Sequence, residues 1–316
     1  MLISQKSSSL LQNKLQNGSE VFCSGLFLSA RWAVVSQVAI RKTHLIVLPT
    51  RESAEYCSAD LYNMVEGDSV FFLPESGKSV ERSNYKSSLG VQRTAAIGKL
   101  LEKADDRLFI VSYPEAIEEK IPSQKKLEGA LFTIKAGENL AYEALRARLQ
   151  EEGFEKVDFV SAPGQYAIRG AVIDIFSYSL EKPYRITFFG NEVDKINTFD
   201  CNTQLSIEKL EKADIYPDIA AKEADDEEGV SLLTLLPADA TVWLDSSDMY
   251  REKPFFQELS AYKRVYLDIP LKRQEVESVS FHIAPQPVFN KNFELLISDI
   301  RSRIESNYKV YIFGEK

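Results

Sequence analysis

The sequence is poor in the residues from which metal sites and disulfide frameworks are built. Its three cysteines, Cys23, Cys57 and Cys201, lie far apart, and its two histidines are His44 and His282. Without Cys-x-x-Cys spacing, these cysteines argue against a disulfide framework or a zinc site and suit a reducing compartment. No acidic residue stands at metal-ligand spacing from either histidine, which disfavours metal catalysis and a histidine-dependent triad.

Long apolar runs and an excess of basic charge are also missing. No stretch reaches the ~18 apolar residues of a membrane span, and the N-terminus lacks the charged-then-apolar pattern of a signal peptide. The formal net charge is -9, so the chain as a whole is not an electrostatic clamp for nucleic acid, although this does not exclude a local basic patch. These absences predict a cytoplasmic protein with no membrane contact.

What is present is the composition of an ordinary folded protein. Hydrophobic residues make up 44% of the 316 residues and charged residues 27%. This length is sufficient for two or three domains and a substantial core.

Residues 1–127 alternate between helical and strand patterns, which predicts a parallel sheet with helices on both faces. Thr50 is placed to cap a helix over residues 51–64. The polar stretch 75–89 predicts an exposed loop, and a break at residues 120–128 marks the end of this first part. The other predicted elements are a helix over residues 29–40 and apolar strands over residues 44–49, 69–74 and 107–113.

Residues 128–217 have the pattern of an α+β domain. A strand over residues 131–135 precedes a helix with apolar side chains on one face, and Gly153 is placed to end that helix. Three strands joined by two hairpins follow. They are residues 166–176, residues 184–189 and a third strand after the two-residue turn at Gly190 and Asn191.

The second of these strands has an unusual distribution of side chains. Because side chains alternate between the two faces of a strand, Arg185, Thr187 and Phe189 share one face. Ile186 and Phe188 share the other face, and if that face is the core, an arginine and an aromatic ring are exposed together. These residue types dominate binding hot spots. The alternative is that Arg185 pairs with a neighbouring carboxylate and Phe189 packs on a loop.

Residues 218–316 return to the α/β pattern after the acidic run 225–228, which we interpret as a solvated linker. A helix is predicted over residues 292–305. Because the sequence stops shortly after an apolar strand pattern, we expect a fragment of a longer protein. The predicted strands are residues 241–244, 264–268 and 309–313.

The loop that begins at Gly25 occupies the place of a nucleotide-binding P-loop but lacks its chemistry. Ala30 stands in place of the second glycine, Arg31 in place of the lysine, and Trp32 in place of the hydroxyl that holds magnesium. Asp245 ends a later apolar strand but is followed by serine instead of a second acid. It is therefore either a strand-end cap or a lone magnesium partner, and we expect no ATPase activity from this chain alone.

Several segments closely resemble the domain that UvrB and the bacterial transcription-repair coupling factors (Mfd) share. The most specific is residues 163–176, Pro-Gly-Gln-Tyr-Ala-Ile-Arg-Gly-Ala-Val-Ile-Asp-Ile-Phe, followed by residues 183–194 and the Phe-Asp pair at 199–200. Residues 45–55 and 236–245 fit too, so the resemblance extends over nearly the whole chain. The coupling factors are the better match, because UvrB keeps an intact P-loop and a long aromatic hairpin that this sequence lacks.

This resemblance implies a docking surface for UvrA, the subunit that brings the excision machinery to a stalled RNA polymerase. The contact residues of the family match Arg169, Arg185 and Phe189, while Thr187 lies where relatives often carry an acid. RNA polymerase and double-stranded DNA would be bound by other domains of a full-length protein, and ATP and magnesium by its motor domains. For this chain we expect no cofactor, no metal and a monomer.

We therefore predict an α/β protein with a P-loop-like parallel-sheet domain whose nucleotide site is degenerate. That domain comprises residues 1–127 and 218–316 and is split by an inserted α+β, UvrA-binding domain at residues 128–217. The predicted function is non-catalytic recruitment of UvrA, linking a stalled RNA polymerase to nucleotide excision repair. Two alternatives stay open: a UvrB-type DNA-dependent ATPase, and an autoinhibitory clamp on the translocase motor of a full-length protein.

Overall fold

The computed structural model describes residues 5–38, 42–65, 69–76, 83–102, 107–178, 182–219, 229–268, 278–283 and 287–310. The chain divides into two compact units, Met1–His282 and Ile283–Lys316. The first unit contains the sheets. The second contains α9 (Phe293–Glu305), which confirms the predicted helix and begins after the N-cap Asn292.

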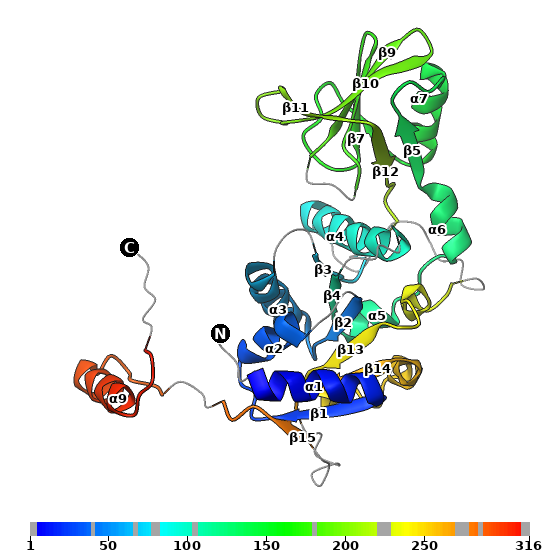
Figure 1. The fold of residues 1–316 in the computed structure, drawn as a ribbon. Coiled ribbons are helices and arrows are strands. Elements are labelled where there is room, and N and C mark those ends of the chain that lie inside the picture. Colours follow the sequence, from blue (N-terminus) through cyan, green and yellow to red (C-terminus); the bar gives the residue numbers. More distant parts are fainter. Residues whose placement is uncertain are drawn as a thin grey trace. The chain divides into compact units, whose positions relative to one another are not determined.

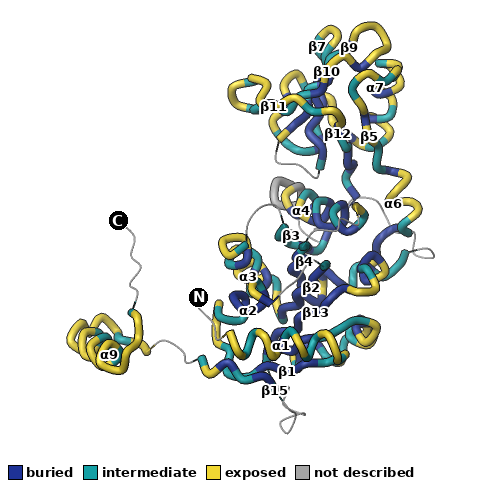
Figure 2. Tube along the Cα trace, viewed as in Figure 1, coloured by how far each residue is buried: buried dark blue, intermediate teal, exposed yellow. Residues whose placement is uncertain are grey.

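Seven parallel strands form the larger sheet, which confirms the predicted sheet type (Figure 1). They are β1 (Glu20–Ser24), β2 (Thr43–Val47), β3 (Val70–Phe72), β4 (Leu108–Ser112), β13 (Thr241–Leu244), β14 (Lys263–Tyr266) and β15 (Ser278–Ser280). Their order is β15-β1-β14-β13-β2-β4-β3. The central strands β2 and β13 are buried along their whole length, as expected for parallel strands covered on both faces (Figure 2). The edge strand β3, predicted from its apolar residues, is only half-buried.

The helix after β2 begins and ends at the predicted residues. The side chain of Thr50 accepts the backbone N–H of Ser53, and the hydroxyl of Ser53 accepts the backbone N–H of Thr50, which together form a capping box. The helices of the first unit are α1 (Gln5–Asn17), α2 (Ala30–Val38), α3 (Arg51–Met64), α4 (Ser83–Glu102), α5 (Pro114–Glu118), α6 (Gln124–Ala130), α7 (Tyr142–Glu151) and α8 (Pro254–Glu258), with 3-10 turns η1 (Leu232–Leu235), η2 (Ser247–Met249) and η3 (Leu259–Ala261).

Two stretches that the sequence assigned to a loop and to a break contain helices. The predicted loop 75–89 includes the start of α4, where Leu89 is buried. The predicted break at residues 120–128 includes most of α6, where Leu127 is buried. The loop prediction was wrong for residues 83–89, because a few apolar side chains fix α4 on the core even though the surrounding residues are polar. The break as the end of the first part stays a prediction.

A second group of strands lies between α6 and the acidic run. They are β5 (Phe132–Lys135), β6 (Glu155–Lys156), β7 (Gln165–Arg169), β8 (Val172–Ile175), β9 (Tyr184–Phe189), β10 (Glu192–Phe199), β11 (Ser206–Leu210) and β12 (Lys212–Ile215). Six of them form a sheet in the order β11-β10-β9-β8-β7-β6, and β12 pairs with β5 in a separate two-stranded sheet. One face of the six-stranded sheet packs into a common core with α7, where Leu145 and Leu149 meet Ile173, Ile186 and Phe188.

Residues 166–176 form a hairpin and not the single strand that was predicted. The chain turns at Gly170, whose φ of +60° lies in the left-handed region that glycine adopts easily. β7 and β8 then pair antiparallel, with Ala167 opposite Asp174. The stretch where the sequence predicted three strands therefore contains four antiparallel strands, β7 to β10, and β11 continues the antiparallel sheet.

Some predictions fall partly or wholly outside the described residues. Of the predicted last strand, Lys309 and Val310 lie in no strand, and residues 311–313 are not described. The acidic run 225–228 is not described either. The domain boundaries at residues 127 and 217 stay a prediction. Among the described helices, none is both long and apolar enough for a membrane crossing.

Candidate partner-binding site

Strands β7 to β10 have one face on the core that they share with α7. We call the opposite face of these strands the outer face. Along β9 the alternation follows the prediction, with Ile186 and Phe188 buried and Arg185 and Thr187 partly exposed. Phe189 is 81% exposed at the end of the strand. The outer face therefore carries an open aromatic side chain, and the alternative in which Phe189 packs on a loop is wrong.

Asp174 lies at the centre of the outer face and is only 1% exposed. It stands opposite Arg185 in the β8–β9 pair, and the guanidinium binds both of its oxygens, Nε to Oδ1 at 2.8 Å and Nη2 to Oδ2 at 2.9 Å. Arg169 also donates to Oδ2 from Nη2. Hydrogen bonding to Asp174 raises the pKa of Arg185. The alternative in which Arg185 pairs with a neighbouring carboxylate is therefore correct, and one buried carboxylate holds two arginines.

This cluster of Arg169, Arg185 and Asp174 carries a formal net charge of about +1, because two guanidinium groups share one carboxylate. Aromatic rings support both cations: Arg185 lies 4.3 Å from the ring centre of Phe199, and Arg169 lies 5.2 Å from that of Phe159. Both arginine side chains remain partly exposed. The cluster is therefore a fixed cationic group that a solvent-borne carboxylate can still reach.

Sequence reasoning placed Arg169, Arg185 and Phe189 in one site, and the structure brings the two arginines together on Asp174. Sequence reasoning missed Asp174, and it also missed Gln204 and Phe159, which contact Arg169. The available signal was an acid between Ile173 and Ile175, since a carboxylate inside an apolar strand is almost always paired. The identity of its partners depends on strand register, which that pattern does not give.

The carboxyl end of the seven-stranded sheet is the other candidate region. Arg31, at the start of α2, forms an ion pair with Asp245, which follows β13. Trp32 is buried, and the loop before it exposes Phe27. Burial, followed by the charges of Asp245 and another nearby acid, raises the pKa of Asp268 to about 6. Arg31 and Asp245 are thus engaged with each other, whereas the buried Oδ1 of Asp268 accepts no hydrogen bond from the described residues.

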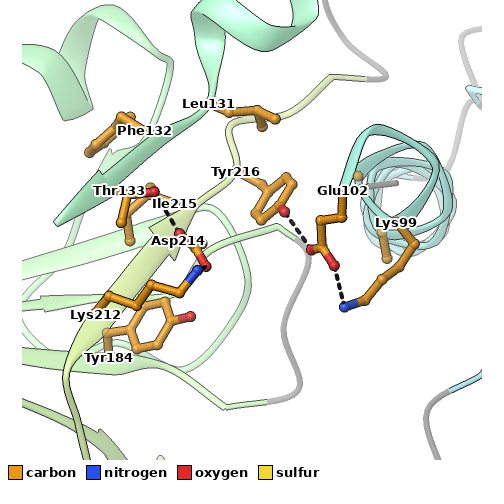
Figure 3. Close-up of a pocket in the computed structure, with 12 residues that line it drawn as sticks. Lys99, Glu102, Leu131, Phe132, Thr133, Tyr184, Lys212, Asp214, Ile215 and Tyr216 are labelled. Carbon is orange, nitrogen blue, oxygen red and sulfur yellow. Dashed lines mark hydrogen bonds and ion pairs between the residues drawn. The ribbon is translucent and has the colours of Figure 1, made fainter. Parts of the chain in front are cut away.

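A cavity of about 580 Å³ lies where α4 meets β5 and β12 (Figure 3). In one wall, the Tyr216 hydroxyl donates to Glu102 at 2.6 Å, and Lys99 donates to the other oxygen of that carboxylate at 2.8 Å. In the opposite wall, Lys212 donates to Asp214 at 2.7 Å. Each acid is thus neutralised within its own wall, which gives the cavity no excess charge with which to attract an ion.

Tyr216 joins the two sides of this cavity. Its backbone N–H donates to the hydroxyl of Ser177 at 2.8 Å, which ties it to the inserted strands. Its ring lies against Gly98 of α4, where an added Cβ would come within 2.7 Å of the ring. Among the described residues, no group of three or more His, Cys, Asp or Glu side chains is arranged to hold a metal ion. We therefore call this cavity the joint, meaning the place where α4 contacts the strands β5 and β12 through Tyr216.

Comparison with known proteins gives a family match that includes the strands β5 to β12, and relatives that match a larger part of the chain. Residues 132–220 match the family model described as the UvrB interaction domain. The transcription-repair-coupling factor of Bacillus subtilis (strain 168) is 33% identical over 209 residues, which is 65% of this chain and 18% of that protein. That of Escherichia coli (strain K12) is 38% identical over 91 residues, 29% of this chain and 8% of that protein.

A third relative, the transcription-repair-coupling factor of Haemophilus influenzae (strain ATCC 51907 / DSM 11121 / KW20 / Rd), is 30% identical over 185 residues, 58% of this chain and 16% of that protein. The chain thus matches less than a fifth of the length of each of these relatives. These matches confirm the predicted relationship.

Proposed function

We propose that this chain, which is related to the UvrB-homology module of the transcription-repair-coupling factors, recruits UvrA through the outer face of strands β7 to β10. The observation that carries the proposal is the coincidence of two features inside residues 132–220. That segment matches the UvrB interaction domain, and it also presents the cationic cluster on Asp174 together with the open ring of Phe189.

The proposed contact combines charge with apolar burial. Arg169 and Arg185 retain N–H groups beyond those that bind Asp174, because a guanidinium has five donors in a fixed fork. These groups would bind carboxylates of UvrA, and Phe189 would enter an apolar pocket. Since Asp174 already fixes both arginines, binding would cost less side-chain entropy than it would with two free side chains.

The chain itself would be non-catalytic. In a working nucleotide site a lysine binds phosphate and an aspartate binds magnesium. Here Arg31 and Asp245 form an ion pair with each other, so neither is free for these roles. The buried Trp32 offers no hydroxyl for a metal. This supports a degenerate nucleotide site. Contacts with RNA polymerase and DNA, and the use of ATP, would belong to the parts of a coupling factor that this chain does not match.

Calorimetric titration with purified UvrA tests this proposal. Phe189→Ala should weaken binding by about 30-fold, which corresponds to the ~2 kcal/mol typical of a hot-spot residue. Arg185→Ala should weaken it by a similar factor. Matched controls are Tyr62→Ala, an exposed aromatic residue on α3, and Arg146→Ala, a surface arginine on α7, and both should bind like the unaltered chain. Equal affinity for Phe189→Ala and Tyr62→Ala would contradict the proposal.

A further inference from the structure

We propose that the turn formed by residues 200–205 is part of the UvrA-docking surface, with Gln204 positioning the two arginines and Leu205 and Phe159 providing apolar contacts beside them. This inference rests on the proposed function. It adds a positioning residue and two contact residues to the three that the family resemblance implies.

The turn has a tightly bonded construction. Asp200 Oδ1 accepts the backbone N–H groups of Asn202 and Thr203, at 3.0 and 2.7 Å, and also the Thr203 hydroxyl at 3.0 Å. These hydrogen bonds, led by that of the Thr203 backbone, lower the pKa of Asp200. The backbone closes the turn, because Gln204 N–H donates to Asp200 and Asp200 N–H donates to Leu205. A turn so bonded presents Gln204 and Leu205 in fixed positions.

Gln204 is the link from this turn to the arginines. Its backbone carbonyl accepts a hydrogen bond from Arg185 Nη1 at 2.8 Å. Its side-chain oxygen lies 3.4 Å from Arg169 Nη2 and 3.5 Å from Arg185 Nη2, while its side-chain nitrogen donates to the Cys201 carbonyl at 2.7 Å. The short backbone contact is the strong one, and the two longer contacts add electrostatic attraction.

Gln204 combines the backbone contact to Arg185 with an unusual backbone conformation. Its φ of +60° lies in the left-handed region, which few residues other than glycine adopt without strain. The same residue accepts the hydrogen bond from Arg185 at its backbone carbonyl. A residue held in a disfavoured conformation next to a candidate binding group suggests a functional reason for the strain.

The apolar residues beside the arginines indicate the kind of segment that would bind. Leu205 is 68% exposed directly after Gln204, and Phe159 is 61% exposed with its ring beside Arg169. Because Arg169, Arg185 and Asp174 carry net positive charge, the complementary group is a carboxylate. The surface therefore fits a segment of UvrA in which an acidic residue is flanked by apolar side chains.

Two substitutions at Gln204 test whether the position of its backbone carbonyl matters for UvrA binding. Gln204→Val should displace the carbonyl, because a β-branched residue disfavours positive φ, and should weaken UvrA binding by about tenfold. Gln204→Asn should bind within about twofold of the unaltered chain, since asparagine tolerates this conformation. Leu205→Ala and Phe159→Ala, which remove exposed side chains, should each weaken binding by about fivefold. Tyr62→Ala is the matched control.

A second readout does not depend on UvrA. In nitrogen-15 spectra, the Arg185 Nη1–H signal, which reports the hydrogen bond to the Gln204 carbonyl, should exchange slowly with water in the unaltered chain and in Gln204→Asn, and faster in Gln204→Val. Unchanged exchange and unchanged affinity in Gln204→Val, with Arg185→Ala still weakened, would overturn the inference. Absence of any UvrA binding by the unaltered chain would overturn the docking role together with the proposed function, and the exchange rates would then still decide whether Gln204 positions Arg185.

Discussion

Two buried aspartates in this chain are held by arginines, and they differ in how many. At the carboxyl edge of the seven-stranded sheet, Asp245 pairs with Arg31. On the outer face of the six-stranded sheet, Asp174 holds both Arg169 and Arg185. One-to-one pairing neutralises both groups, whereas two cations on one anion leave a positive charge over. The number of arginines per aspartate therefore decides whether such a cluster is neutral or keeps a positive charge that can attract an anionic group.

The surroundings of the two aspartates increase this difference. Near Asp245, the pKa of Asp268 is raised to about 6 by burial and then by the charges of Asp245 and Asp248. Further acid at this edge makes the approach of a phosphate group less favourable. On the outer face, the exposed neighbours include the rings of Phe159 and Phe189. The first region therefore combines a neutral ion pair with further acid, whereas the second combines a cationic cluster with exposed aromatic rings.

Removing each aspartate should give the largest difference between the two regions. Asp174→Ala leaves two partly buried guanidinium groups without their carboxylate, and we expect it to lower the free energy of unfolding by about 3 kcal/mol. Asp245→Ala leaves one arginine that can turn toward water, and about 1 kcal/mol is expected. Urea denaturation followed by circular dichroism measures both. A loss for Asp245→Ala as large as that for Asp174→Ala would show that the partner ratio does not matter.

The local parts of the fold were predictable from the sequence. The capping box fixes the start of α3 at Thr50 through residues three positions apart, and strand alternation placed Phe189 in solvent. The beginning of α4 was missed because its first residues are mostly polar and show no apolar period in the sequence, although Leu89 further along the helix is buried. Local patterns therefore predicted elements well where the apolar face ran along the whole element.

The clusters themselves were beyond such patterns. Arg185 and Asp174 meet because β8 and β9 pair in one particular register, and a shift by one residue would turn Asp174 into the core. Arg31 and Asp245 lie 214 positions apart in the sequence. The sequence identified the arginines through a family resemblance, but which carboxylate holds them, and in what ratio, depends on tertiary structure.

The pH dependence of stability sharpens the comparison at the Asp245 edge. Asp268 has a folded pKa of about 6, above its ordinary value of 3.8, so the folded state binds its proton more tightly than the unfolded state. The stability from this group is fully present below about pH 4 and is lost as the pH rises through about 6. Asp268→Asn should therefore be more stable than the unaltered chain near pH 7, with a flatter stability curve between about pH 4 and pH 7.

Thermal unfolding over this pH range, compared between the variant and the unaltered chain, measures the effect. Asp214→Asn is the control, because Asp214 is not among the acids that raise the pKa of Asp268, pairs with Lys212 at 2.7 Å and should lose stability when neutralised. If Asp268→Asn followed the pH curve of the unaltered chain, the crowding of acids at this edge would be too weak to matter. The contrast with the cationic outer face would then rest on the arginine ratio alone.

The smallest effect on stability is expected at Tyr216 in the joint, the place where α4 contacts the strands β5 and β12. The joint belongs neither to the Asp245 edge nor to the outer face. Tyr216→Phe removes the hydroxyl that donates to Glu102, while Lys99 continues to neutralise that acid. Burial raises the pKa of Tyr216, so its hydroxyl stays protonated and the lost interaction is one hydrogen bond, worth about 1 kcal/mol of unfolding free energy. UvrA affinity should not change, because the outer face does not include Tyr216. Calorimetric titration with UvrA tests this, with Tyr62→Phe as the control. A clear loss of affinity in Tyr216→Phe alone would mean that recruitment depends on how α4 holds the strands β5 to β12 as well as on the charge that these strands present.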